Sequence, residues 1–170
     1  MHGGVTPFRL NDTAQAGLIA AAYTLLSLVF YPISFGVYQV RVAEALTVLP
    51  FLSRAAVPGL FIGCLLANLF GGLGWQDVVF GSLLTLLAAV LTRAVALLIR
   101  SRYAWLLAPV PPVLVNALGV SLYLAPIIGV GYWFAVQMIG IGQLVACGLI
   151  GLPLLRLLQS RAGLFGAPAN

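Results

Sequence analysis

The sequence predicts an all-α integral membrane protein with six transmembrane helices. Of its 170 residues, 62% are hydrophobic and only 6% are charged, and the mean hydropathy is +1.13. Soluble domains carry roughly 25% charged residues, so this composition indicates a chain that lies in a lipid bilayer. Each span needs roughly 20 apolar residues, which leaves room for at most about six to seven spans with short connections and for no separate soluble domain.

Proline, glycine and short polar turns set the expected boundaries of the first three helices. The first apolar run is followed by Pro32, and the second ends at Pro50, because proline interrupts the backbone hydrogen bonding of a helix. A turn at Ser53 and Arg54 precedes the third run, and a glycine-rich loop at 71–77 follows it. We expect these spans at residues 13–31, 40–52 and 55–70, the second being short for a full crossing.

The remaining three runs are longer. The fifth begins with Pro109, Pro111 and Pro112, so its regular helix is expected to start near Pro112, where proline suits a first turn. The sixth is long enough to tilt and is expected to bend near Pro153. We expect these spans at residues 78–99, 105–124 and 132–158. The membrane domain then covers residues 13–158, between cytoplasmic tails at 1–12 and 159–170.

The basic residues predict the orientation. All eight are arginines, and with six spans both termini share one side. That side holds seven of the eight: Arg9, Arg54, Arg93, Arg100, Arg102, Arg156 and Arg161. Because Lys and Arg are enriched on the cytoplasmic side, both termini are expected in the cytoplasm. Arginines scattered between apolar runs indicate topology rather than a nucleic-acid site, in spite of the net charge of +5.

Arg41 and Glu44 stand out as charges inside an apolar segment. Three residues apart, they share one face of a helix, so they either pair with each other or face a common cavity. Ionisable residues at membrane depth indicate a functional site by default, because burying them in lipid is costly. The alternative is a purely structural ion pair.

Other polar and aromatic residues are expected in the same outer half of the membrane. Amide groups supply paired hydrogen-bond donors and acceptors, a carboxylate accepts two N–H groups, and aromatic rings stack on planar ligands. Together these amide, carboxylate and aromatic groups predict an outward-facing pocket for a nucleobase-like molecule. The amides could instead join helices, and the tryptophans could belong to the interfacial belt. The candidates besides Arg41 and Glu44 are Asn68, Trp75, Asn116, Trp133, Gln137 and Gln143.

A surface of small residues is expected on the first helix, at Ala16, Gly17, Ala20 and Ala21. Such a surface lets another helix approach closely, either a neighbouring span or a partner protein.

No catalytic or metal site is expected. Cys64 and Cys147 lie in apolar surroundings without metal-ligand spacing. The sole histidine, His2, lies in the tail, and no Ser/His or Cys/His arrangement is evident, so neither an enzyme nor a cofactor is expected.

Four runs together resemble the QueT family of queuosine-precursor transporters over about residues 14–158. The runs are YQVRVAEALTVLPFL, ANLFGGLGWQDVVFGSLLTLLAA, PPVLVNAL and VQMIGIGQLVACGLIGLPLL. Members of this family are the substrate-binding S components of energy-coupling factor (ECF) transporters. The resemblance implies a multi-pass protein of the plasma membrane that captures a 7-aminomethyl- or 7-cyano-7-deazaguanine from outside. It departs at Gln143, where relatives reading GIGE carry Glu.

The resemblance also implies partners. Small residues of the first helix, here Ala16 and Ala20, would dock onto a transmembrane T component that is driven by two ATPases. In the expected mechanism Glu44 anchors the ligand and Arg41 orients it. Asn68, Asn116 and Gln137 complete the hydrogen bonds, and Trp75 or Trp133 closes over the ring. The open alternatives are an S component for another planar, vitamin-like ligand and a self-contained secondary transporter, although no convincing internal repeat is visible.

Overall fold

The structure, a computed structural model, describes residues 10–34 and 41–160, which form helices joined by turns and contain no strand. The predicted all-α class is confirmed for this part of the chain. The helices are α1 (Leu10–Val29), α2 (Tyr31–Ser34), η1 (Val42–Phe51), α3 (Ala56–Gly71), η2 (Asp77–Gly81), α4 (Ser82–Leu98), η3 (Ala104–Leu107), α5 (Val110–Ile128), α6 (Tyr132–Gln143), η4 (Leu144–Gly151) and α7 (Leu152–Gln159).

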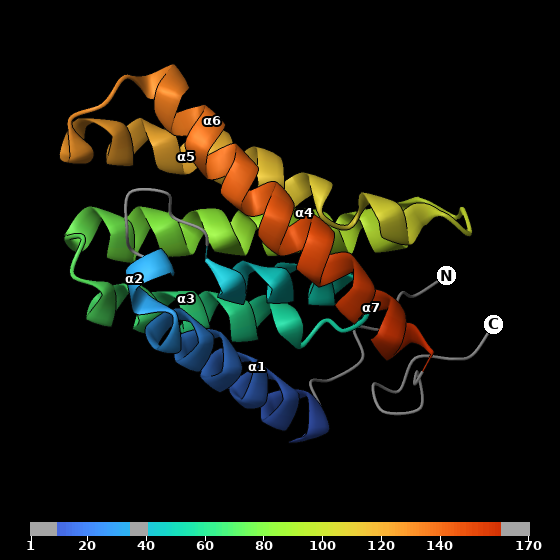
Figure 1. Ribbon diagram of the computed structural model, residues 1–170. Coiled ribbons are helices and arrows are strands. Elements are labelled where there is room, and N and C mark those ends of the chain that lie inside the picture. The colour runs from blue at the N-terminus through green and yellow to red at the C-terminus, as the bar shows by residue number, and fades with distance from the viewer. Residues whose placement is uncertain (1–9, 35–40, 161–170) are drawn as a thin grey trace, which may run out of the picture.

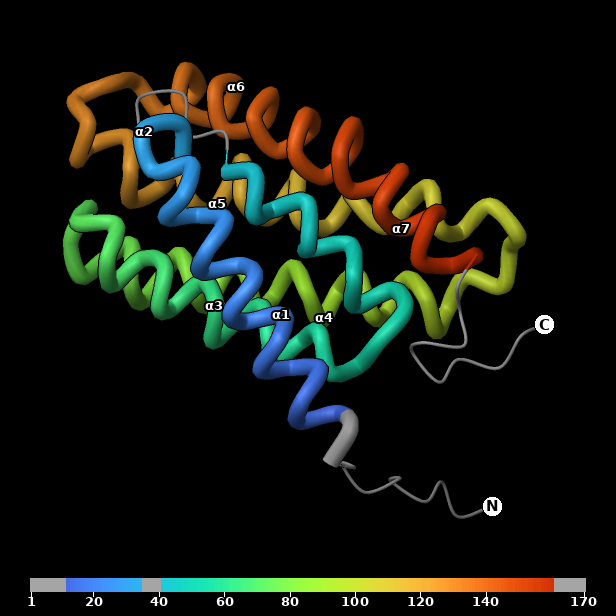
Figure 2. Tube along the Cα trace, turned by 60° about the horizontal axis from the view of Figure 1, so that its bottom comes forward, coloured from blue at the N-terminus to red at the C-terminus, as the bar shows by residue number. Residues whose placement is uncertain are grey.

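The short helix η1 lies at the centre of the bundle. It packs against α1, α3, α4 and η4, and Figure 2 shows it between α1 and the continuous rod formed by α6, η4 and α7. Helix α5 packs on both α4 and α6. Because helices surround η1, most of its residues are buried, including Glu44 and Thr47. A charged residue on this helix is therefore shielded from lipid by protein.

Four helical stretches are long and apolar enough to cross a membrane: Asp12–Val29, Asp77–Leu98, Ala104–Ile128 and Tyr132–Gln159. Two apolar helices, η1 and α3, are shorter. Large aliphatic side chains such as Leu18, Leu122 and Leu149 are strongly exposed, as expected for a surface in contact with lipid. The chain is therefore a helical membrane protein. Crossing by all six predicted spans stays a prediction.

The arginines separate between the two ends of the bundle. At one end, here called the Arg54 end, Arg54 pairs with Asp12 at 2.6 Å and Arg93 lies 3.4 Å from the backbone oxygens of Pro50 and Phe51. Helix α1 begins and α7 ends toward this side of the molecule (Figure 1). Arg41 lies toward the other end, beside Asp77. The distribution agrees with the predicted asymmetry, although Arg9, Arg161 and most of the tails lie outside the described residues. The cytoplasmic placement of the termini stays a prediction.

Several helix boundaries differ from the predicted ones. Pro32 lies inside the short helix α2 rather than after the first span, and α5 begins at Val110 and continues through Pro126. Asp77 belongs to η2 rather than to the preceding loop. Trp75 and Gln76 are already helical, and the amides of Asp77 and Val78 bond to the Gly74 carbonyl at 3.2 and 3.3 Å, so the loop ends before Asp77.

Helices α1 and α3 approach each other so closely that α3 requires glycine. A Cβ added at Gly59 would lie 2.7 Å from the carbonyl oxygen of Ala16, and one at Gly63 would lie 2.9 Å from that of Ala20. Ala16 and Ala20 are accordingly buried, whereas Gly17 and Ala21 are exposed. Of the two expectations for the small residues, internal packing therefore holds for Ala16 and Ala20. Their expected role as an exposed docking surface is corrected.

We expect Gly63→Ala to lower the free energy of unfolding by about 1–3 kcal/mol, because overpacking a tight helix contact forces the backbone to shift. The new methyl would lie 2.8 Å from the Cβ of Tyr23. Thermal unfolding of the purified protein in detergent measures the change. The control is Gly17→Ala, whose added methyl meets no atom within 4 Å. A Gly63→Ala variant as stable as wild type would show that α1 and α3 do not approach this closely.

Candidate functional site

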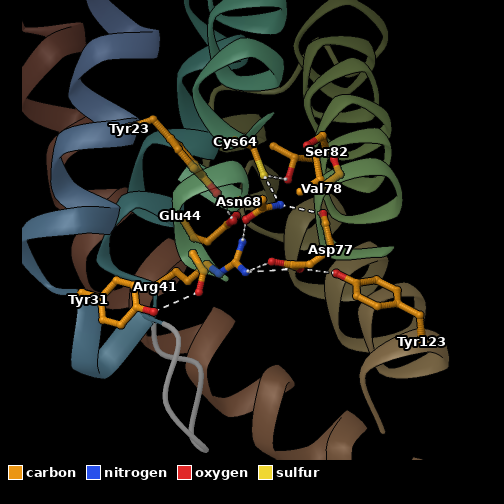
Figure 3. Close-up of polar contacts among 12 residues, drawn as sticks. Tyr23, Tyr31, Arg41, Glu44, Cys64, Asn68, Asp77, Val78, Ser82 and Tyr123 are labelled. Atoms are coloured by element: carbon orange, nitrogen blue, oxygen red, sulfur yellow. Dashed lines mark hydrogen bonds and ion pairs between the residues drawn. The ribbon is translucent and has the colours of Figure 1, made fainter. Parts of the chain in front are cut away.

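Arg41 forms the first half of the site, a buried ion pair. Arg41 directly precedes η1 with extended backbone, at φ −80° and ψ 103°. Its guanidinium donates to Asp77 Oδ2 at 3.0 Å and to Asn68 Oδ1 at 2.8 Å (Figure 3). The helix begins after Arg41, so Arg41 and Glu44 do not lie on one helix face. Of the two expected alternatives, they do not form a salt bridge with each other but line a common cavity. The carboxylate that forms a salt bridge with Arg41 in the described residues is Asp77.

Asp77 is held on several sides. Tyr123 donates its hydroxyl to Asp77 Oδ1 at 2.7 Å, and the Asn68 amide donates to the Asp77 backbone oxygen at 2.8 Å. Gly81 leaves room for this arrangement, since a Cβ there would lie 2.8 Å from Asn68 Nδ2 and 3.0 Å from the Tyr123 hydroxyl. Arg41 is therefore fixed by a carboxylate that is itself fixed from α3 and α5.

Glu44 forms the second half of the site and is only 2% exposed. Tyr23 from α1 donates a hydrogen bond to its Oε1, and the Asn116 amide from α5 donates to its Oε2 at 3.1 Å. No salt bridge to Glu44 forms among the described residues. A buried carboxylate held by neutral donors is less well compensated than one paired with a cation. Glu44 is thus suited to accept further donors from a ligand.

A small cavity lies between the two halves of the site. Its volume is about 10 Å³, which is room for about one water molecule. The Oδ1 atom of Asn116 is buried and has no hydrogen-bond partner in the described part of the chain. The cavity therefore offers acceptor atoms to a ligand, but a ligand larger than water requires the walls to move. Its lining consists of Arg41, Glu44, Gly81, Thr85, Asn116, Val120, Ile139 and Gln143.

Non-α helical segments supply much of this site. Glu44 lies on η1, which is a 3₁₀ helix, and Asp77 and Gly81 lie on η2, which is a π-helix. Gln143 immediately precedes a second π-helix, η4, whose Cys147 donates to Gln143 Oε1 at 3.2 Å. Such segments are uncommon and frequently occur at functional sites, because they redirect side chains and free backbone groups.

The structure brings together five of the eight predicted ligand residues. Arg41, Glu44, Asn116 and Gln143 line the cavity, and Asn68 adjoins it through Arg41. Trp75, Trp133 and Gln137 are exposed and do not line it. The rings of Trp75 and Trp133 lie against Phe80 and Tyr132, with centroids 5.9 and 5.1 Å apart. Contact of any of these residues with a ligand stays a prediction.

Sequence reasoning missed Tyr23, Asp77, Thr85 and Tyr123. One signal for Asp77 was available: it is one of only three acidic residues, and a buried arginine needs a carboxylate. Tyr23 carries no comparable signal, because a tyrosine inside an apolar helix is compatible with packing alone. Within the described ranges no group of three His, Cys, Asp or Glu side chains is placed to hold a metal ion. Cys64 and Cys147 are buried free thiols.

A helical membrane protein that encloses a polar cavity among its helices has the organisation of a solute-binding or transport protein. The family is identified directly: the chain belongs to the QueT transporter family, whose model matches residues 13–160. Comparison with curated proteins and with solved structures gave no match. The resemblance in the four sequence runs is therefore confirmed, and it places the chain among transporters.

Asp77→Asn is expected to lower the free energy of unfolding by about 3–5 kcal/mol, because it removes one charge from a buried ion pair and leaves the other. The control is Asp12→Asn, whose partner Arg54 has a side chain 38% exposed, so its loss should cost about 0–1 kcal/mol. Unfolding followed by intrinsic tryptophan fluorescence measures both variants. Equal losses in the two variants would contradict the central role of the buried pair.

Proposed function

We propose that this protein is the S component of an ECF transporter and captures a 7-deazaguanine precursor of queuosine from outside the cell. In this proposal it crosses the plasma membrane six times, with both termini in the cytoplasm. The QueT family supplies the transporter class. The single observation that carries the ligand assignment is the Glu44 carboxylate, which faces the cavity without a salt bridge from the described residues.

The ligand edge that suits this cavity carries N–H donors. Glu44 accepts hydrogen bonds, the unpartnered Oδ1 of Asn116 accepts another, and the Gln143 amide can both donate and accept. A 2-amino lactam edge, as in 7-deazaguanine, presents adjacent N–H groups to such acceptors. Arg41 lines the same cavity and, already neutralised by Asp77, would donate to a ligand carbonyl oxygen. Both the 7-aminomethyl and the 7-cyano forms carry this edge.

Binding requires the cavity to open, because its volume of about 10 Å³ is far smaller than a fused-ring ligand. The loop before η2 is the candidate gate in this proposal. Gly72 and Gly74 adopt positive φ angles of 73° and 105°, which favour glycine. Trp75 follows directly and is 64% exposed, so a movement of this loop would bring it toward a bound ring.

The exposed face of α1 is the proposed contact for the T component, which two ATPases drive. Gly17 and Ala21 lie on this face, whereas Ala16 and Ala20 face α3. Small exposed residues let a partner helix approach closely in a membrane. Movement of the partner would then reorient the S component so that its cavity opens toward the cytoplasm.

Glu44→Gln is expected to raise the Kd for 7-aminomethyl-7-deazaguanine by roughly 10- to 150-fold, the loss typical of hydrogen bonds to a charged group. Isothermal titration of purified protein against deazaguanines and a panel of vitamins measures this. The control is Thr92→Val, which removes a buried hydroxyl that bonds the Ala108 carbonyl and does not line the cavity. Unchanged affinity in Glu44→Gln would remove Glu44 as the anchor. Tight binding of a vitamin alone would replace the ligand assignment.

Ala21→Trp is expected to block assembly with the T component and the ATPases while ligand binding stays at the wild-type level, because the new ring occupies the α1 contact surface. Co-purification of the complex measures assembly, and titration measures binding. The control is Leu122→Trp on α5, where the native side chain is 69% exposed. Normal assembly of the Ala21→Trp protein would exclude this docking surface. Uptake that continues without any ATPase would instead identify a secondary transporter.

A further inference from the structure

A second, larger hollow lies outside the site, between the end of α4 and the start of α5. It has a volume of about 340 Å³ and is lined by apolar side chains, among them Ala94 and Leu98 from α4, Ile99 directly after it, and Val110 and Leu114 from α5. This volume lies within the range of roughly 300–1,000 Å³ that is typical of ligand pockets. In a membrane, an apolar groove of this size on an outer surface faces acyl chains.

Two arginines lie in the connection between α4 and α5, directly after the groove residue Ile99. Arg100 directly follows Ile99, and Arg102 is two residues further on, both with exposed side chains. Arg102 donates to the Tyr103 hydroxyl at 2.5 Å and lies 4.6 Å from the centre of that ring. Arg100 makes no hydrogen bond or ion pair with any residue that the structure describes.

None of the three acidic side chains, all of which the structure describes, is placed to neutralise the two arginines. The three acidic residues of the sequence are Asp12, Glu44 and Asp77. Asp12 pairs with Arg54, and Asp77 pairs with Arg41. Glu44 lines the cavity of the candidate site, away from this groove. Arg100 and Arg102 therefore form a positive site that an external anion can complete, directly beside a groove suited to hydrocarbon.

We propose that the α4–α5 groove binds an anionic phospholipid, with an acyl chain along Leu98 and Leu114 and the phosphate at Arg100 and Arg102. Basic pockets between membrane helices recognise anionic headgroups in this way, and their contribution is about 1 kcal/mol per arginine near the surface. The groove and the charge are complementary to the two parts of one lipid molecule. An apolar partner helix would use the groove but would leave both arginines without an anion.

The lipid site is separate from the proposed docking surface. Among the described elements α1 packs on α2, α3 and η1, whereas the groove is formed by α4 and α5. A bound lipid and a partner on the outer face of α1 would therefore not compete. The proposal stands on the groove and its arginines alone and does not depend on the ligand assigned to the cavity.

Native mass spectrometry of the purified full chain tests the proposal with phosphatidylglycerol and phosphatidylcholine of identical acyl chains. We expect wild type to retain phosphatidylglycerol preferentially. The double variant Arg100→Gln/Arg102→Gln should lose affinity for it by roughly 30-fold. The matched control, Arg9→Gln/Arg161→Gln, removes the same charge from the two tails and should leave lipid binding unchanged.

Three outcomes would overturn the proposal. Equal retention of the two lipids by wild type would exclude a headgroup site. An equal loss in both double variants would show that net charge, rather than this groove, attracts the lipid. The third concerns the groove: Ala94→Phe fills it without altering charge and should weaken binding of phosphatidylglycerol. Unchanged binding in that variant would exclude the acyl-chain assignment.

Discussion

The arrangement of the site depends on the buried ion pair between Arg41 and Asp77. A charge in the interior of a membrane protein needs a partner, because the cost of removing it from water is large. This pair links the start of η1 to the start of η2, and Asn68 from α3 and Tyr123 from α5 complete it. The pair therefore fixes where the central helix begins and which way its first turn faces.

Once Arg41 is neutralised by Asp77, Glu44 is left among neutral donors from α1 and α5. The polar residues thus divide into a compensated half, which supports the structure, and a half that retains unused acceptor atoms. The second half is the one suited to recognise N–H groups, since unsatisfied acceptors gain most from a ligand that brings such donors. The division also explains why a chain with three acidic residues can both hold its helices together and present a carboxylate to a cavity.

The helical class, most helix positions and the separation of Arg41 from the other arginines that the structure describes could be predicted from composition and charge, because these depend on residue types along the chain. The ion pair between Arg41 and Asp77 could not be predicted in this way. A spacing of three residues pointed to Arg41 and Glu44 instead, but such spacing indicates a pair only where both residues are helical, and Arg41 precedes the helix. The inward orientation of Ala16 and Ala20 could not be predicted either. The same sequence pattern of small residues suits a helix that faces a neighbouring span and one that faces a partner protein. The contact of these alanines with Gly59 and Gly63 decides between the two.

The small volume of the cavity also has a consequence for binding affinity. Because the cavity holds about one water molecule, the ring-sized solute of the proposed function would bind only to molecules whose walls have separated. The measured dissociation constant then equals the intrinsic one divided by the fraction of open molecules. Substitutions in the loop beside Gly72 and Gly74 can change apparent affinity through that fraction, without altering any atom that touches the solute. Under the proposed function, the affinity for the solute would therefore depend both on the acceptor atoms at Glu44 and on the fraction of molecules in which the helices have separated.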